Sequence, residues 1–417
     1  MSDSLIPRRA ALNLLNAVTV DHRLLSECTA IFDPLSPPDR ARAQRLATSV
    51  LRAASRADRW LKPHLKKRPP VQVQNALRLG VIEIAEGAAP HGVVNDIVTL
   101  LADGKRTANF AALANAVLRK GADLPQQWGK LALPQLPDWL REPLREAWGN
   151  SAINAIERAH FRGAPLDLTI PRDTADWAAR LGGLVLPTGS VRLDGQGMVS
   201  TLPGFAEGAW WVQDAAAALP VRLLGDLRGQ RALDICAAPG GKTMQLASAG
   251  AEVTALDLSA NRLQRVAENL ARTNLNATIV QGDALEFATT GWDVIVLDAP
   301  CSATGTIRRH PDLPFARDGA EIGGLIALQA QMIDHALRLL NPGGRLLFCT
   351  CSLLPDEGEV QVEEALARHP GLRVIPPELP EIEADWISPE GGVRLRPDYW
   401  PSLGGMDGFY MAVLCAP

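Results

Sequence analysis

The chain has 417 residues, of which 47% are hydrophobic and 21% are charged. This composition is typical of folded globular protein and excludes a wholly disordered chain. No apolar run approaches the length of about 18 residues that a transmembrane helix needs, and the opening segment MSDSLIPRRA lacks the apolar centre of a signal peptide. Six cysteines, four of them inside motif-like segments, do not form the pattern of a disulfide framework. We therefore expect a cytoplasmic enzyme of two or three domains.

Charge is distributed unevenly along the chain. Residues 1–150 contain 21 Lys and Arg against 14 Asp and Glu, whereas the rest contains 21 against 32. The segment LRAASRADRWLKPHLKKRPP (51–70) has seven basic residues and one acidic residue. A basic module joined to an acidic body indicates a polyanionic partner, although a solvated charged face has the same composition.

The first 140 residues have the apolar periodicity of helices. Apolar side chains recur at i, i+3, i+4 and i+7 within residues 76–84, 94–101 and 110–117, and prolines separate these runs. We predict an all-helical bundle of six or seven helices over residues 1–140. A helical linker and a small mixed α/β segment follow, and we assign them to residues 141–230.

From Arg231 the pattern changes to alternating strands and helices. The predicted strands are ALDIC, EVTALDL, ATIVQGD, DVIVLDAP, RLLFCTC and FYMAVL. The segments between most of them have helical periodicity, which predicts a doubly wound, largely parallel sheet over residues 231–417. Ligands bind at the carboxyl ends of the strands in such sheets, close to the point where the strand order reverses.

A loop of small residues follows the first of these strands and precedes a helix. It comprises Cys236, Ala237, Ala238, Pro239, Gly240, Gly241 and Lys242. A backbone of small residues next to a helix N-terminus lets a ligand approach closely. The phosphate-binding loop of an ATPase needs Gly six positions before its Lys, where this chain has Cys236. The later segment DVIVLD nevertheless resembles the acidic strand of such ATPases, so an ATPase stays open as an alternative.

One acidic residue follows each of the next strands. Asp257 and Asp283 end the second and third strands, and Asp298 ends the fourth. An acid at the end of the second strand suits a ribose diol, and the next one suits an adenine amino group. Any one of them is equally consistent with a helix cap or a turn. Together they favour an adenosine ligand without phosphates, and S-adenosylmethionine is the candidate cofactor.

Two cysteines lie where later strands end. Cys301 follows Pro300, and Cys351 lies within Thr-Cys-Ser. The chain has no further cysteine or histidine pairs with zinc-ligand spacing, so we expect no metal. A thiolate that adds to C6 of cytosine makes C5 nucleophilic enough to attack a methyl sulfonium. Asp298 is in position to contact N3 and N4 of such a base, and Cys349 is expected to be structural and to face away from Cys351.

Together these segments resemble the RsmB/NOP family of RNA 5-methylcytosine methyltransferases, which have two active-site cysteines. The motifs are CAAPGGKT, ALDLSANR, QGDA, DAPCSATGTIRRHPD, NPGGRLLFCTCSL and DGFYMAVL. The segments NALRLGVIEI, VVNDIVTLL and LANAVLRKG resemble a NusB-like RNA-binding domain. This combination is similar to the bacterial RsmB (Fmu/Sun) type. It implies a Rossmann-like class I methyltransferase domain with a seven-stranded sheet, preceded by a NusB-like helical domain.

The resemblance implies roles for individual residues. Cys351 matches the nucleophile of the family, and Cys301 matches the second cysteine, which is implicated in product release and is a candidate base. Because DNA cytosine methyltransferases use a Pro-Cys nucleophile, Cys301 is the rival for the role of Cys351. The loop 236–242 and the three acids match cofactor-binding positions. Two segments depart from the family pattern: LDLTIPRD lacks Arg-x-Asn, and DEGE stands where the family has Glu-Asn-Glu.

The expected substrate is a cytidine in small-subunit ribosomal RNA, methylated at C5 by a monomer. Arg308, Arg309, Lys66 and Lys67 are the basic residues expected to contact phosphates. The same chemistry on a transfer RNA or on large-subunit ribosomal RNA is an alternative. An ATPase and a non-catalytic RNA-binding antitermination factor are more distant ones.

Overall fold

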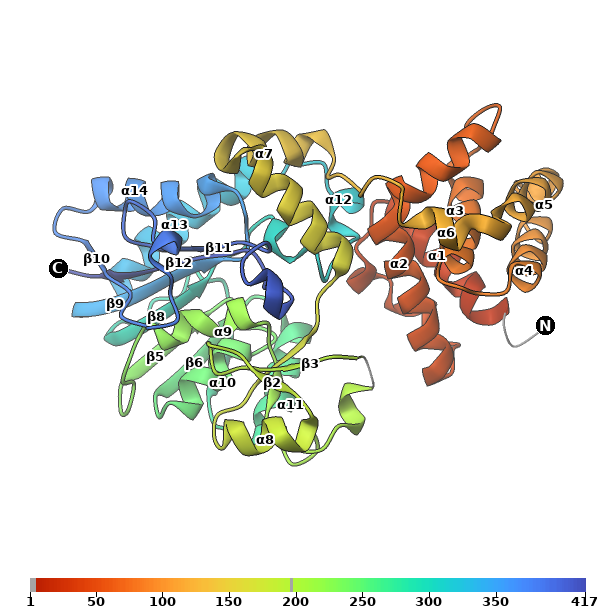
Figure 1. Ribbon diagram of the computed structural model, residues 1–417. Coiled ribbons are helices and arrows are strands. Elements are labelled where there is room, and N and C mark those ends of the chain that lie inside the picture. The colour runs from red at the N-terminus through yellow and green to blue at the C-terminus, as the bar shows by residue number, and fades with distance from the viewer. Residues whose placement is uncertain (1–4, 196–197) are drawn as a thin grey trace. The chain divides into compact units, whose positions relative to one another are not determined.

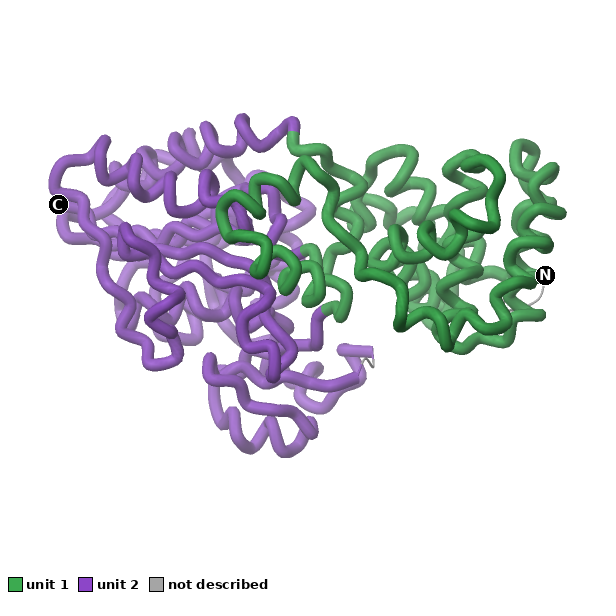
Figure 2. Tube along the Cα trace, turned by 45° about the horizontal axis from the view of Figure 1, so that its top comes forward, with its two compact units in different colours: residues 1–163, 307–319 green, residues 164–306, 320–417 purple. Residues whose placement is uncertain are grey.

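The computed structural model describes residues 5–195 and 198–417. The chain forms two compact units, which Figure 2 shows in green and purple. Unit 1 contains the residues up to 163 together with 307–319, and unit 2 contains 164–306 and 320–417. The segment that follows the Pro-Cys motif therefore belongs to the N-terminal unit. The sequence-based boundary after residue 140 falls inside a helix of unit 1 instead.

Helices joined by turns and loops form unit 1, which has no strand among its described residues (Figure 1). Its helices are α1 (Leu5–Thr19), α2 (Pro37–Leu61), α3 (Val71–Ala85), α4 (Pro90–Ala102), α5 (Ala111–Leu118), α6 (Leu124–Trp128), α7 (Asp138–Arg162) and α12 (Leu313–Ala316). The three predicted apolar stripes form α3, α4 and α5, and their buried side chains share one core with those of α1 and α2. Among the described residues, no helix is both long enough and apolar enough to span a bilayer.

Unit 2 begins with a small sheet that the sequence suggested only as a mixed segment. Its strands are β1 (Leu166–Thr169), β2 (Leu184–Val185), β3 (Val191–Leu193) and β4 (Trp211–Val212), in the order β2-β3-β1-β4 and all antiparallel. One helix, α8 (Thr174–Leu181), connects β1 to β2. Asp167 in β1 is buried and paired with Arg192 of β3 at 2.6 Å.

The large sheet of unit 2 has eight strands among the residues that the structure describes. They are β5 (Arg231–Ile235), β6 (Glu252–Asp257), β7 (Thr278–Gln281), β8 (Trp292–Asp298), β9 (Leu340–Thr350), β10 (Arg373–Ile375), β11 (Val393–Leu395) and β12 (Phe409–Cys415). The order is β10-β12-β9-β8-β5-β6-β7, and β11 pairs with β12. The pairs from β7 through β9 are parallel, and every pair that includes β12 is antiparallel. The predicted doubly wound fold is confirmed, with one more strand than expected.

Helices cover both faces of this sheet, as Figure 1 shows. On one face lie α9 (Ala215–Arg222), α10 (Gly241–Ser248) and α11 (Ala260–Thr273), and on the other lie α13 (Ile322–Leu339) and α14 (Glu359–Arg368). Alternate residues of the central strands pack into the two cores: Val294 and Val296 face α9 and α10, whereas Ile295 and Leu297 face α13 and α14. Burial on both faces explains why these strands are almost continuously apolar.

Two glycines bring the loop after Cys301 against the start of β12. The amide of Gly408 donates to the carbonyl of Gly305 at 2.8 Å, and the amide of Gly305 donates to the carbonyl of Cys351 at 2.9 Å. A Cβ atom added to Gly305 would lie 2.0 Å from the Gly408 carbonyl oxygen. Glycine at position 305 therefore allows three segments that are distant in sequence to meet through their backbones.

We predict that Gly305→Ala destabilises unit 2 by about 1–3 kcal/mol, because backbone must move to accommodate the methyl group. Urea unfolding of the intact protein measures this change. Gly324→Ala is the matched control, since that glycine lies in α13 with nothing within 4 Å of its added Cβ. The control should be neutral or slightly stabilising. Equal unfolding midpoints for the two variants would contradict the close approach.

Candidate functional site

Strand pairing determines where the two motif cysteines lie. Strands β8 and β9 are parallel neighbours, and Asp298 at the end of β8 is opposite Cys349 in β9. Cys301 lies three residues beyond Asp298, and Cys351 lies two residues beyond Cys349. Both chains therefore leave the same edge of the sheet side by side, and the two cysteines meet there.

The sulfur atoms of Cys301 and Cys351 are 3.5 Å apart, and both side chains are half-buried. The hydrogen bond with the Cys351 sulfur, burial and the nearby Glu357 carboxylate raise the pKa of Cys301 well above its ordinary value. Cys301 is therefore held as a thiol at neutral pH. A thiol that keeps its proton is a poor nucleophile.

The structure corrects the expectation for Cys349. Its side chain packs in the same core cluster that Cys351 contacts, not on the opposite face. Residues i and i+2 of a strand point to the same face, so alternation never separates these two cysteines. Cys349 is fully buried, and its thiol lies 3.6 Å from Oδ1 of Asp298. Burial raises its pKa well above the ordinary value, which fits the structural role that was expected.

The loop of small residues connects β5 to α10. It begins at Cys236, whose φ is 62°, and ends at Gly240, whose φ is 103°. The amide of Ala237 donates to the carbonyl of Leu256 in β6 at 3.1 Å, and Gly240 donates to Ala237 at 2.8 Å. Burial and the surrounding carboxylates raise the pKa of the Cys236 thiol to about 12, so this cysteine is not a nucleophile.

The ammonium of Lys242 is paired with Asp298. Its side chain is buried, and Nζ lies 2.7 Å from Oδ2 of Asp298 and 5.1 Å from the centre of the Phe409 ring. Burial alone would lower the pKa of Lys242, but Asp298 and neighbouring groups more than offset this and raise it. The lysine of an ATPase loop contacts the β- and γ-phosphates, and this ammonium is committed to a carboxylate instead. The geometry does not support the ATPase alternative.

The two other acids lie at the ends of adjacent strands. Oδ2 of Asp257 accepts the Ala238 amide at 3.1 Å, and Oδ1 accepts the Ser259 amide at 3.0 Å. Asp257 is only 3% exposed, so it shapes the loop directly. Asp283 is exposed, and its Oδ1 accepts the Leu285 amide at 2.8 Å. A carboxylate has about four lone-pair sites, so each acid retains acceptor capacity for a ligand.

The basic residues expected to contact phosphates fall into two groups. Lys66, Lys67 and Arg309 are exposed residues of unit 1. Arg308 is fully buried, and its carbonyl accepts a hydrogen bond from Arg52 at 3.1 Å. A buried guanidinium does not meet a phosphate at the surface, so the structure argues against Arg308 as a phosphate contact.

Sequence reasoning missed Glu357, which the structure places fully buried beside the Cys301 loop. The helix α14 begins at Glu359, and Glu357 lies in the 3-10 turn before it. The family pattern Glu-Asn-Glu is replaced here by a segment with glycine at position 358, and packing explains the glycine. A Cβ atom at this position would lie 2.4 Å from the guanidinium of Arg394. In the sequence, Glu357 is visible only as an acidic residue six positions after Cys351. Nothing in the sequence distinguishes such a buried acid from an exposed one.

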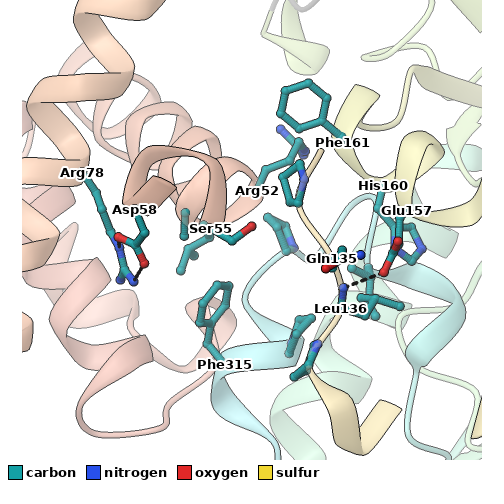
Figure 3. Close-up of a pocket in the computed structure, with 17 residues that line it drawn as sticks. Arg52, Ser55, Asp58, Arg78, Gln135, Leu136, Glu157, His160, Phe161 and Phe315 are labelled. Atoms are coloured by element: carbon teal, nitrogen blue, oxygen red, sulfur yellow. Dashed lines mark hydrogen bonds and ion pairs between the residues drawn. The ribbon is translucent and has the colours of Figure 1, made fainter. Parts of the chain in front are cut away.

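A separate pocket lies in unit 1 (Figure 3). It has a volume of about 270 Å³, and its walls are mostly apolar. Arg52, Ser55, Glu157 and His160 contribute polar groups to its lining. None of the motif cysteines or acids borders it, so this pocket is not where the predicted chemistry takes place. Among the described residues, no cluster of three or more His, Cys, Asp or Glu side chains is arranged to hold a metal.

The sheet order, the small-residue loop after β5 and the acids at successive strand ends define unit 2 as a Rossmann-like methyltransferase fold. Residues 221–415 match the model of the 16S rRNA methyltransferase RsmB/F family, and residues 5–123 match the NusB family. The chain is 35% identical to ribosomal RNA small subunit methyltransferase B of Xanthomonas campestris pv. campestris, over 98% of this chain and 96% of the relative. The protein of the same name from Pseudomonas putida is 36% identical, over 98% of each chain. The chain belongs to the RsmB/F family of methyltransferases.

Solved structures share the fold. The crystal structure of PH0851 aligns with a TM-score of 0.75 at 21% identity, over 97% of this chain and 98% of that one. A methyltransferase homologue from Pyrococcus horikoshii aligns with a TM-score of 0.56 at 26% identity, over 66% and 94%. The predicted NusB-like helical domain and Rossmann-like methyltransferase domain are thus both confirmed.

Buried His160 in α7 generates a prediction for acid stability. It is 7% exposed, and its ring nitrogens have no hydrogen-bond partner among the described residues. Burial and the charges of Arg308 and Arg52 lower its pKa to about 3. The unfolded chain takes up a proton near pH 6.5 and the folded chain does not, so stability falls as pH falls below about 6.5.

Between pH 7.5 and pH 5.5 we expect the free energy of unfolding of the wild-type protein to fall by about 1.4 kcal/mol because of this residue. The His160→Leu variant should not show this decrease. Urea unfolding of the intact protein at pH 7.5 and 5.5 measures the difference, with hydrogen exchange in peptides from α7 as the readout. His91→Leu is the control, because His91 is exposed. An unchanged pH dependence in His160→Leu would contradict the buried neutral imidazole.

Proposed function

We propose that this protein transfers a methyl group from S-adenosylmethionine to C5 of one cytidine in small-subunit ribosomal RNA, through a covalent bond between Cys351 and C6. The observation that carries the proposal is the pair of sulfur atoms 3.5 Å apart, at strand ends adjacent to the small-residue loop. The names of the relatives, which are small-subunit ribosomal RNA methyltransferases, support the choice of RNA. The same chemistry on another RNA is an outcome that the test below distinguishes.

The residues of the proposed cofactor site fit a methyl sulfonium donor. The donor set is acidic, with Asp257, Asp283 and Asp298 at successive strand ends, and the one lysine is already ion-paired. Such a set suits hydroxyl groups, amino groups and a positive sulfonium, and it repels a triphosphate. When bound, S-adenosylmethionine supplies an electrophilic methyl group. In our proposal the backbone of residues 236–242 lies against the bound cofactor. Asp257 accepts hydrogen bonds from the ribose hydroxyls, and Asp283 accepts one from the adenine amino group.

Cys351 is the proposed nucleophile. Its thiol loses a proton to solvent, its sulfur forms a bond with C6, and the ring electrons move to C5. C5 would then take the methyl group of a bound donor, whose sulfur keeps the electron pair of the broken bond and leaves as a neutral thioether. Loss of the C5 proton next restores the C5–C6 double bond and expels the Cys351 sulfur as thiolate. Because C6 lies within the stacked base, the cytidine must leave its stack to reach the sulfur.

Asp298 and Lys242 are proposed to hold the edge of the base. Asp298 is half-buried and already accepts from Nζ of Lys242. The carboxylate has capacity to accept from the N4 amino group, and the adjacent ammonium offsets negative charge that develops at N3 during the addition. This extends the expected contact of Asp298 with N3 and N4 to a pair of residues.

Cys301 is proposed to act in product release. Its raised pKa holds the proton on its sulfur before reaction, beside the sulfur that attacks. Once the sulfur of Cys351 is bonded to the ring, it no longer raises the pKa of Cys301, so the Cys301 thiol loses its proton to solvent and the resulting thiolate receives the C5 proton. Exposed Lys66, Lys67 and Arg309 of unit 1 are proposed to contact RNA phosphates.

Two cysteine variants test the roles of the sulfurs. Cys351→Ala should reduce methyl transfer at least about 1000-fold, because the covalent route is lost. Cys301→Ala should add to the base but release slowly, so that a covalent enzyme–RNA complex accumulates. Gel shift under denaturing conditions and filter-bound tritium from labelled methyl donor measure the two effects.

Cys415→Ala is the control, since this cysteine lies at the far end of β12 from Phe409. It should retain wild-type turnover and form no stable adduct. Full turnover by Cys351→Ala would overturn the assignment. A covalent adduct that forms only in Cys351→Ala would show that Cys301 is the nucleophile.

The acid at the end of β6 generates a second test. Asp257→Asn removes one of two acceptor oxygens that the loop and the ribose are proposed to share, so the affinity for S-adenosylmethionine should fall about 10- to 100-fold. Calorimetric titration of the folded variant measures it. Asp226→Asn is the control, because the Asp226 side chain is exposed and pairs with Arg228. Equal affinities of the two variants would contradict the proposed ribose contact.

Bisulfite mapping of total RNA from a strain that lacks this gene identifies the substrate. We expect one cytidine of the small-subunit ribosomal RNA to lose its protection from conversion by bisulfite. Lost protection in a transfer RNA or in the large subunit would keep the chemistry and change the substrate. Unchanged protection of every RNA would contradict the proposal.

A further inference from the structure

Glu357 is a buried acid that the chemistry above does not use. Its side chain is 0% exposed, and three donors converge on its carboxylate. Oε1 accepts the Ser302 amide at 2.9 Å and the Gln329 side-chain amide at 3.1 Å, and Oε2 accepts the Ser302 hydroxyl. Burial of a carboxylate costs desolvation free energy unless hydrogen-bond donors compensate it. The three donors therefore have to stay in place around Glu357.

These contacts hold both neighbours of Cys301. Ser302 follows Cys301 and is bound directly by Glu357. Pro300 precedes Cys301, and its carbonyl accepts the side-chain amide of Gln329 at 2.8 Å. Gln329 lies in α13, is fully buried and bridges Pro300 to Glu357. The loop that carries Cys301 is therefore fixed on each side of the sulfur.

The same residue is tied to the segment that carries Cys351. The hydroxyl of Thr350 donates to the backbone carbonyl of Glu357 at 2.8 Å. Ser352, on the other side of Cys351, lies 3.2 Å from the hydroxyl of Ser302. Glu357 thus contacts Thr350 and Ser302, one flanking residue of each cysteine, and stands where the two segments join.

We propose that Glu357 is a positioning residue that locks the Pro300–Ser302 loop to the turn after β9 and thereby fixes which of the two sulfur atoms attacks. This inference rests on the proposed function, because it concerns the roles of Cys301 and Cys351. Covalent catalysis tolerates little displacement, and an error of about 1 Å in a reacting group costs about 100-fold in rate. Besides holding the loop, the buried negative charge opposes ionisation of the nearby Cys301 thiol.

Two substitutions separate the geometry from the charge. Glu357→Gln retains the size and hydrogen-bonding shape but removes the charge, so Cys301 should ionise more readily. Glu357→Asp retains the charge but withdraws the carboxylate from Ser302. Glu381→Gln is the matched control, because Glu381 is an ion-paired acid with a 4% exposed side chain in the same unit.

The first readout is alkylation of the enzyme without RNA by iodoacetamide, followed by peptide mass spectrometry. In the wild-type enzyme Cys351 should react before Cys301. In Glu357→Gln the rate at Cys301 relative to Cys351 should rise at least about threefold, while Glu357→Asp and Glu381→Gln should keep the wild-type ratio. This readout needs neither substrate nor turnover, so it is independent of whether the proposed function holds.

The second readout is steady-state methylation. Both Glu357 variants should lose at least about 10-fold in kcat with KM for RNA changed less than about threefold, whereas Glu381→Gln should lose neither. A folded Glu357→Gln enzyme with wild-type alkylation ratio and wild-type kcat would overturn the inference. If Glu357→Gln does not fold, Glu357→Asp decides alone: normal kcat in that variant would overturn it. Failure of the proposed function appears instead as full turnover by Cys351→Ala.

Discussion

The pairing of β8 with β9 is the constraint on which the site depends. Their parallel register sets Asp298 opposite Cys349, and the two chains then leave the sheet together. A shift of β9 by one residue along β8 would separate the sulfur atoms of Cys301 and Cys351. The contact between Gly305 and Gly408 and the cluster around Glu357 both hold loops that this pairing has already brought together.

Electrostatics then distinguishes among similar groups in one small volume. Burial and neighbouring carboxylates keep Cys236 and Cys349 protonated, and the adjacent sulfur keeps Cys301 protonated. Lys242 is committed to Asp298 and is not available to a phosphate. The surroundings of these groups therefore argue against a phosphate-binding role for Lys242.

Much of the architecture was predictable because the determinants are local. Apolar periodicity predicted α3, α4 and α5 as well as the strands from β5 to β9, and motif spacing indicated that the cysteines lie at strand ends. The short strands β10 and β11 have three residues each, too few for a periodic signal. The burial of Arg308 and of Glu357 depends on packing against segments distant in sequence, and a charged side chain has no local feature that reveals this. Cys349 was placed on the wrong face by a misapplied alternation.

The most direct test of the account is to react the enzyme with S-adenosylmethionine and RNA that contains 5-fluorocytidine. Fluorine replaces the proton that must leave C5, so the covalent complex cannot break down after methyl transfer. Protease digestion and mass spectrometry then identify the residue bonded to the base. The account predicts a methylated fluorocytidine on the peptide that carries Cys351. A bond at Cys301, or the absence of any adduct from an enzyme that methylates the unmodified RNA, would contradict it.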